Sequence, residues 1–565
     1  MLAQCAAMPL AAPALAILTD AAVAGDGVRA GWAAVAVAVL AVLALTAGHF
    51  AHVFYFELGE RVQLAVERDL IDLANGSAGL EHHERPDYAD RLRVLRQELD
   101  WAGWTSMEIL FSAVGLAVGV SITATLLATL DPVLLLLPAF AIPSLLLGRK
   151  AEALMGDARE AAAPHTRRLR HLVRLATDAG PAKEVRACGL GGELRERQRA
   201  TWGQATDILV AGERRSALLQ VSGQLVFAVA YIAATLLVVR SVVAGRGTVG
   251  DVVLVISLAA QVNQQATAAV TLLVGLQRIA RTLGNLQWVR ELVLAERPAP
   301  DRELPATIRE GITLRGVDFA YPGTERVVLG GVDLHLPAGR TVAIVGENGA
   351  GKSTLVKLLC RFYEASEGVI ELDGTDVRRF PLEAWRERIA AGFQDFARFE
   401  FLARETIGLG DLPRIGDDSA VRDALHRARG DDLLDRLDAG LDTQLGKQNA
   451  DGTELSGGQW QKLALGRAMM RTEPLLLVLD EPTSALDAQA EHELFERYAA
   501  SAKRVAQRTG AVTVLVSHRF STVRMADLIL VVADGRISES GSHAELIAAG
   551  GLYAELYGMQ AAAYR

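Results

Sequence analysis

A glycine-rich run between an apolar strand and a helix carries the clearest chemistry in the chain. Residues 341–345 predict a buried strand, and residues 354–361 predict a helix. The pattern between them is GxxxxGKS, in which backbone N–H groups and a helix N-terminus enclose phosphate oxygens. The spacing predicts that Lys352 reaches the β- and γ-phosphates of a nucleotide and that the Ser353 hydroxyl binds Mg²⁺. The predicted loop comprises Gly346, Glu347, Asn348, Gly349, Ala350, Gly351, Lys352, Ser353 and Thr354.

A second buried strand, residues 475–479, ends in the acidic pair Asp480 and Glu481. Five apolar residues before a carboxylate are typical of a central strand that delivers an acid to a metal site. We expect Asp480 to hold Mg²⁺ through water and Glu481 to orient or polarise the attacking water. Acidic residues at strand ends are also common on surfaces, so this prediction depends on the glycine-rich loop.

Between these strands lies Leu455-Ser456-Gly457-Gly458-Gln459, followed by a helical run. Read alone, it is a small-residue turn before a helix. In this position it resembles the signature of ATP-binding cassette (ABC) proteins. The resemblance implies that the signature of one cassette caps the ATP held by the phosphate loop of another, with the N–H groups that open the helix as an anion site.

Single residues at other points resemble further marks of this family. Tyr321 resembles the aromatic residue that stacks on adenine, and Gln394 resembles the glutamine that joins the magnesium site to the membrane domain. Asp487 lies in a segment similar to the loop at the dimer seam, and His518 resembles the switch histidine that contacts the γ-phosphate. The resemblance implies catalytic roles for Glu481, His518 and Gln394 and a Mg²⁺ contact from Gln394.

Two residues depart from the family pattern. Lys447 stands where these proteins usually have Glu, and Trp460 stands where Arg or Lys is common. Neither belongs to the predicted catalytic set, so the departures bear on coupling and not on hydrolysis.

The part of the chain before about residue 280 holds nearly all of an apolar excess that is high for a soluble protein (mean hydropathy +0.22). Six stretches approach or exceed the roughly 20 residues that cross a bilayer. The predicted spans are residues 2–24, 31–56, 104–130, 132–147, 218–243 and 249–276. A secretory signal peptide is the alternative for the first, but no Lys or Arg precedes it and no clean cleavage pattern follows.

The connections between spans alternate between short breaks and long arginine-rich segments. Since positive residues stay in the cytoplasm, we expect the long connections, both termini and the ATP site there, in a multi-pass protein of the cytoplasmic membrane. Helical spacing predicts helices in the long connections, whose charge fits either a solvated surface or helices that run on past the bilayer to a soluble domain. The expected extensions are residues 57–73, 87–99, 151–177 and 193–213, with contacts to a soluble domain at residues 87–90 and 183–187.

The predicted fold class is a membrane α-helical bundle followed by an α/β P-loop NTPase domain with a largely parallel sheet. Residues 1–295 form the six-helix domain, residues 296–305 a proline-rich linker, and residues 306–565 the ATP-binding cassette. Six spans fused to a cassette resemble the exporter-type half-transporters. The resemblance implies an ATPase that drives transport as a homodimer or heterodimer.

The expected cargo is an amphipathic small molecule or peptide, because no ring of charged residues appears within the spans. Uptake of a metal-chelate compound and a sensing membrane ATPase without cargo are the alternatives. Glutamines in the fifth and sixth spans, Gln220, Gln224, Gln261, Gln264 and Gln265, suit a cavity lining and interhelical hydrogen bonds equally. The net charge of −9, with no sign of clustered basic surface, argues against nucleic acid as a partner.

Overall fold

The computed structural model of the chain describes residues 2–76, 79–293, 299–447, 449, 451–481, 488–517 and 519–563. It divides into two compact units, the first made of Met1–Asp72 and Arg91–Arg290, the second of Leu73–Asp90 and Glu291–Arg565. The second unit therefore takes in a short segment from the connection that follows the second predicted span.

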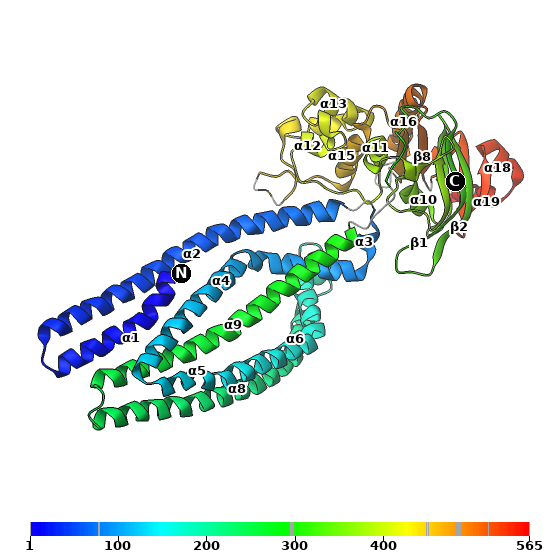
Figure 1. Ribbon diagram of the computed structural model, residues 1–565. Coiled ribbons are helices and arrows are strands. Elements are labelled where there is room, and N and C mark those ends of the chain that lie inside the picture. The colour runs from blue at the N-terminus through cyan, green and yellow to red at the C-terminus, as the bar shows by residue number, and fades with distance from the viewer. Residues whose placement is uncertain are drawn as a thin grey trace. The chain divides into compact units, whose positions relative to one another are not determined.

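Among the described residues, six helical segments are long and apolar enough to cross a membrane, as predicted (Figure 1). The fourth is built from a 3-10 turn η1 (Pro132–Leu136), a short helix α5 (Leu137–Phe140) and α6. The principal helices are α1 (Leu2–Val23), α2 (Gly27–Gly76), α4 (Pro86–Leu130), α6 (Ile142–Thr177), α8 (Gly191–Val243) and α9 (Val249–Val293). The charged extensions continue these helices without a break, which confirms the helical prediction for the long connections.

The short connections turn where the sequence breaks the apolar pattern. Gly25 and Gly245 adopt φ of +74° and +76°, a conformation that favours glycine. Asp131 caps η1 by accepting a hydrogen bond from the Val133 amide at 2.9 Å, and Pro132 occupies the first turn. The predicted boundaries between neighbouring spans therefore have local physical causes.

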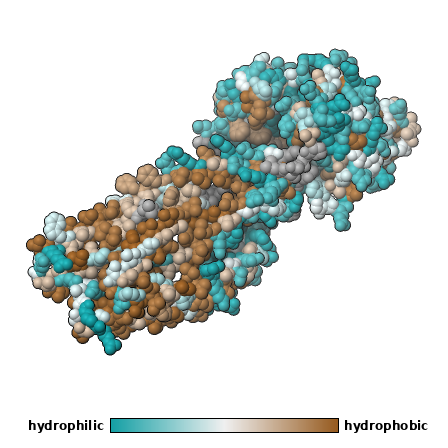
Figure 2. All heavy atoms as spheres, viewed as in Figure 1, coloured by the Kyte–Doolittle hydropathy of each residue, from teal (hydrophilic) through white to brown (hydrophobic). Residues whose placement is uncertain are grey.

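Helices α6 and α8 pack closely because glycines remove side chains from their contact. A Cβ atom on Gly212 would lie 2.5 Å from the Cβ of Ala158, and one on Gly223 would lie 2.8 Å from the Cα of Ser144. Small residues at such contacts let membrane helices approach each other. Large apolar side chains such as Trp32 and Phe54 are exposed. Figure 2 shows apolar residues over most of the visible face of the first unit and hydrophilic ones over most of the second.

The second unit contains two sheets with a shared core. A six-stranded sheet has the order β10-β9-β3-β8-β7-β6 and is parallel except for the β9–β10 pair. A four-stranded antiparallel sheet, β2-β1-β4-β5, packs on it and was not predicted. The strands are β1 (Gly311–Ala320), β2 (Val327–Pro337), β3 (Thr341–Val345), β4 (Glu367–Leu372), β5 (Thr375–Asp376), β6 (Ile389–Gly392), β7 (Leu476–Asp480), β8 (Val512–Val516), β9 (Leu528–Ala533) and β10 (Arg536–Gly541).

Helices flank the six-stranded sheet, and its central strands β7 and β8 are buried along their whole length, as apolar runs in parallel sheets usually are. The helices are α10 (Lys352–Leu359), α11 (Leu382–Glu387), α12 (Ala403–Gly408), α13 (Asp418–Arg427), α14 (Asp431–Leu434), α15 (Gly457–Met469), α16 (Ala488–Thr509), α17 (Phe520–Val523), α18 (His543–Ala549) and α19 (Leu552–Ala563). The described part of this unit also contains three 3-10 turns, at Val377–Arg379, Leu412–Arg414 and Gly440–Asp442.

Trp460 packs inside a second core cluster, formed by α12, α13 and α15 against the sheet. Its side chain is 2% exposed, and Leu463 and Tyr498 belong to the same cluster. The large aromatic side chain at this position is thus part of the core.

Replacing Trp460 with Ala is expected to destabilise the second unit by about 3–5 kcal/mol, because a buried aromatic side chain is lost and a cavity remains. The measurement is differential scanning calorimetry of the purified chain. Trp202→Ala is the control, since Trp202 lies on α8 and is 59% exposed. Equal unfolding temperatures for the two variants would contradict the packing role.

Candidate nucleotide and coupling site

The glycine-rich loop joins β3 to α10, as predicted, and two of its glycines are required by geometry. Gly346 adopts φ of +150°, and a Cβ atom there would lie 2.1 Å from the Val532 carbonyl oxygen. Gly351 adopts φ of +106° at the start of α10, where a Cβ atom would lie 2.7 Å from the Leu329 side chain. The loop can therefore follow this path only with glycine at both positions.

Lys352 lies over the mouth of this loop. Its Nζ donates hydrogen bonds to the carbonyl oxygens of Gly346 at 2.9 Å and Glu347 at 2.8 Å. Burial lowers the pKa of the Lys352 amine, and the carboxylates of Glu481 and Asp480 oppose this shift. The amine therefore stands beside the predicted acidic pair, in reach of a phosphate held by the loop.

Asp480 ends β7 next to the loop and is 6% exposed. Burial raises the pKa of this carboxyl, and the Ser353 hydroxyl, which is hydrogen-bonded to it, acts in the opposite direction. Its Oδ1 atom is buried and has no hydrogen-bond partner among the described residues. A carboxylate oxygen and a hydroxyl are hard donors that suit Mg²⁺, so the residues present fit this ion.

Glu481 turns away from β7 with φ of +46°, an uncommon backbone conformation of the kind found at functional sites. Its amide donates to the Val516 carbonyl at 3.0 Å, which holds the turn against β8. Gln394, which follows β6, donates from Nε2 to Glu481 Oε2 at 2.9 Å. The structure thus brings Lys352, Asp480, Glu481 and Gln394 together.

Tyr321 lies beside the same loop. Its hydroxyl hydrogen-bonds the Thr354 hydroxyl at 3.0 Å, and Lys357 Nζ lies 5.1 Å from the centre of its ring. The ring is therefore held next to α10, and adenine stacking on it stays a prediction.

The signature residues open α15 as a double cap. Ser456 Oγ accepts from the Gln459 amide at 3.3 Å, and Gln459 Oε1 accepts from the Ser456 amide at 2.8 Å. A Cβ atom on Gly457 would meet no atom within 4 Å. The cap is a rigid surface at a positive helix end, suited to a phosphate. Asp487 and His518 lie outside the described residues.

A short helix, α3 (Glu81–Glu84), packs on the cassette within the second unit. The Leu80 amide donates to the Phe362 carbonyl at 2.9 Å, and Glu84 pairs with Lys357 at 3.6 Å. His82 and Tyr88 are 4% and 1% exposed. The predicted contact at residues 87–90 stays a prediction, because the ring of Tyr88 packs on His82 and His83 of the same segment, whereas the hydrogen bond and the ion pair to the cassette lie at residues 80–84.

Phe362, which accepts the hydrogen bond from Leu80, also lies next to the predicted catalytic group. The ring of Phe362 lies 5.7 Å from that of Phe393, which directly precedes Gln394. Sequence reasoning missed Leu80, Glu84, Lys357 and Phe362. The available signal was the break made by Gly76, Gly79 and Pro86, which leaves room for a separate short helix between α2 and α4.

The second predicted contact, residues 183–187, forms most of α7 (Ala182–Ala187) in the first unit. None of its residues is buried. A contact of this helix with a soluble domain stays a prediction.

Two of the candidate cargo residues act as interhelical links. Gln261 Nε2 donates to the Met8 carbonyl at 2.7 Å, and Gln265 Nε2 donates to the Thr123 hydroxyl at 3.0 Å. These bonds connect α9 to α1 and to α4. They favour the structural reading of these two glutamines over a cavity lining.

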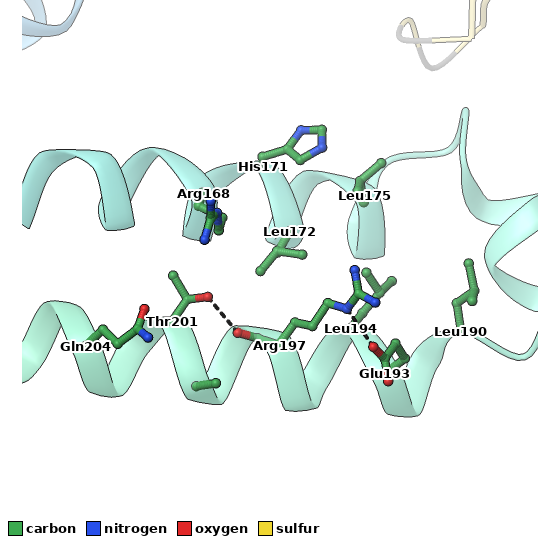
Figure 3. A pocket seen from close by; sticks show the side chains of 11 residues that line it. Arg168, His171, Leu172, Leu175, Leu190, Glu193, Leu194, Arg197, Thr201 and Gln204 are labelled. Carbon is green, nitrogen blue, oxygen red and sulfur yellow. Dashed lines mark hydrogen bonds and ion pairs between the residues drawn. The ribbon is translucent and has the colours of Figure 1, made fainter.

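A cavity of about 670 Å³ lies between α6 and α8 (Figure 3). Leu172 points across the gap towards α8. Arg197 is ion-paired with Glu193 at 2.6 Å. The gap is thus mainly apolar and contains none of the predicted nucleotide residues.

Comparison with known proteins agrees with this geometry. Residues 329–484 match the family described as "ABC transporter". "ATP-dependent lipid A-core flippase" proteins of Methylococcus capsulatus and Pseudomonas fluorescens are each 43% identical, over 252 and 258 residues. Each match covers 45% of this chain and 40% of the relative, so the chain is matched over about two fifths of these relatives' length.

A solved structure, described as a bacterial Atm1-family ABC exporter with ATP bound, matches with a TM-score of 0.75 and 24% identity. The match covers 98% of this chain and 96% of the other, which confirms the predicted fold along nearly the whole chain. Residues 329–484 are therefore similar to the ABC transporter family, in a chain whose described residues include six membrane-type helices and whose fold is that of an ABC exporter.

Proposed function

We propose that the chain is one half of a dimeric, ATP-hydrolysing exporter that moves an amphipathic compound out of the cytoplasm. One observation carries the proposal: Lys352, Asp480, Glu481 and Gln394 converge at one sheet edge in a chain with six membrane-type helices. The positive charge of the long connections supports a cytoplasmic location of the cassette, where ATP is available.

ATP completes its site only across two cassettes. The phosphate loop supplies Lys352 and Ser353, and Ser456 of a second copy covers the γ-phosphate. Because ATP binds the closed pair of cassettes more tightly than the open pair, ATP binding shifts the population of dimers towards the closed state. A shift from 1:99 to 99:1 requires about 5.5 kcal/mol of differential binding.

Hydrolysis resets the pair. Ser353, Asp480 and Gln394 would hold Mg²⁺, which would neutralise charge on the phosphates. Glu481 accepts a proton from the attacking water, with its carboxylate oriented by Gln394. By resemblance to the family, we assign the γ-phosphate contact to His518 and a role at the seam between the cassettes to Asp487.

The cargo we propose has an apolar portion of lipid character. The relatives named above are described as lipid A-core flippases. A metal-chelate importer and a sensing ATPase would both share the nucleotide site, but the relatives and the exporter fold do not favour import.

Flux measurements in inside-out membrane vesicles test the proposal. We expect ATP-dependent movement of a fluorescent phospholipid from the outer to the inner leaflet of these vesicles, and none in vesicles carrying Glu481→Gln. Movement in the reverse direction would indicate import. ATP turnover that is indifferent to every amphiphile tested would indicate a sensor.

Leu80→Pro is expected to reduce transport per ATP hydrolysed several-fold, because proline cannot donate the hydrogen bond to Phe362. Leu80→Ala keeps the amide and is the matched control. ATP binding, measured with a fluorescent analogue, should be equal in both variants. Equal coupling ratios in both would show that the α3 contact does not transmit motion.

A further inference from the structure

A cavity of about 390 Å³ lies on the second unit, at the sheet edge opposite the phosphate loop. Its lining includes Ala390, the second residue of β6, and Leu477, the second residue of β7. It therefore lies at the amino ends of these parallel strands, whereas the loop follows the carboxyl end of β3. Its volume is within the range of small-molecule sites, about 300–1,000 Å³.

Four arginines line this cavity and no acidic side chain does so among the described residues. Arg508 is ion-paired with Glu473 outside the lining. The other three form no ion pair with a carboxylate in the described part of the chain. The lining arginines are Arg427, Arg471, Arg504 and Arg508.

Two of the guanidinium groups are held in place by backbone carbonyls. Arg427 Nη2 donates to Met469 O at 2.7 Å, and Arg471 donates to Gly410 O at 3.1 Å and Ile389 O at 2.9 Å. A guanidinium has five N–H donors, so each retains others. Their orientation is thus fixed before any ligand arrives.

Without an anion, burying the positive charges of Arg427 and Arg471 costs free energy of desolvation. Burial lowers the pKa of both Arg427 and Arg471. At Arg427, Asp423 opposes the shift, while Arg504 and Arg414 add to it. At Arg471, Asp411 and Glu387 oppose it. Desolvated charge of one sign is relieved most effectively by an anion that bonds to it.

We propose that this arginine cavity, lined by Arg427, Arg471, Arg504 and Arg508, binds a small phosphorylated anion. The planar fork of arginine matches phosphate oxygens bidentately. Thr472, Ser501 and Gln507 add neutral polar groups to the lining. A bound phosphate would connect the end of α13 to α16, and so would join the helical part of the cassette to its sheet.

Isothermal titration of the purified full chain with inorganic pyrophosphate tests the proposal. The chain carries Lys352→Ala, which weakens binding at the phosphate loop. We expect one pyrophosphate per chain, weakened by at least about tenfold in Arg504→Glu because a charge-assisted contact is lost. Lys503→Glu is the matched control: Lys503 is exposed, adjacent and outside the lining, and its change of charge is the same.

Two lipid environments distinguish the sources of phosphate. In nanodiscs, pyrophosphate binding that is weaker with phosphatidylglycerol than with phosphatidylcholine would assign the site to a lipid headgroup, provided that Arg504→Glu removes this difference between the two lipids. Equal binding in both would assign it to a soluble phosphate. No saturable binding, or equal loss in Lys503→Glu, would overturn the proposal. Arg504→Gln, which only removes the charge, should give an intermediate loss.

Discussion

Replacing Glu481 with Gln is expected to lower ATP turnover by about 10²–10⁴-fold while ATP binding and closure of the cassettes persist. The change removes the basic carboxylate but keeps the size of the side chain. The amide oxygen of the variant can still accept the hydrogen bond that Gln394 donates to Glu481 Oε2. The substitution should therefore slow the hydrolysis step and leave the structure of the site unchanged.

Phosphate release from the purified protein measures turnover, and retention of a fluorescent ATP analogue measures binding. Glu367→Gln is the control for the change of charge, because Glu367 is exposed on β4. Normal phosphate release from Glu481→Gln would exclude Glu481 as the base. Loss of both binding and release would instead show that the carboxylate serves the fold.

The parts of the site that sequence predicted well are those in which chemistry is local. The loop from Gly346 to Thr354 contains its own strand end, turn and helix start, so spacing alone predicts its geometry. Asp480 and Glu481 follow an apolar run, and parallel pairing then brings them to the same edge as the loop. Hydropathy predicted the six membrane segments because the apolar length of a span is also a local property of the sequence.

The parts that sequence missed depend on contacts between distant residues. Leu80 meets Phe362, and Glu84 meets Lys357, across more than 270 positions of chain. No periodicity marks such a pair in advance. The second sheet was missed because it forms only when β1 pairs with β4, about fifty to sixty positions later, although β1–β2 and β4–β5 are local hairpins.

Trp460 illustrates the same limit. From its position after the signature, we expected this departure from the family pattern to affect coupling. The side chain is instead buried in a core cluster, to which Tyr498, some forty residues later, also belongs. A single-sequence pattern reports residue type and spacing, whereas the partner that fills a core is set by tertiary packing.

Mixed dimers of two inactive variants are expected to recover activity. Ser456→Arg places a bulky cation at the cap of α15, and Lys352→Ala removes the phosphate-loop amine. A dimer of either variant alone has no intact site, because every site lacks one of the two groups. A dimer with one copy of each has one site in which the phosphate loop and the facing signature are both unaltered.

The two variants carry different affinity tags, and sequential purification isolates only the mixed dimer. If its two sites act independently, its ATP turnover should be about half that of the unaltered dimer, because a two-fold assembly has two equivalent sites and one is restored. If each chain instead completed its own site, the mixed dimer would be as inactive as its parents. Failure to isolate any two-tag complex would show that the second cassette belongs to a different chain.

The mixing experiment separates the dimeric site from damage to the fold. Ser456→Arg also removes a helix cap, a change that costs about 1 kcal/mol. A chain that merely misfolded could not regain turnover from a partner whose own phosphate loop is disabled. Restored activity therefore requires that the loop of Lys352 and the signature of Ser456 act on one ATP from opposite chains, which is the arrangement that lets nucleotide binding close the cassettes.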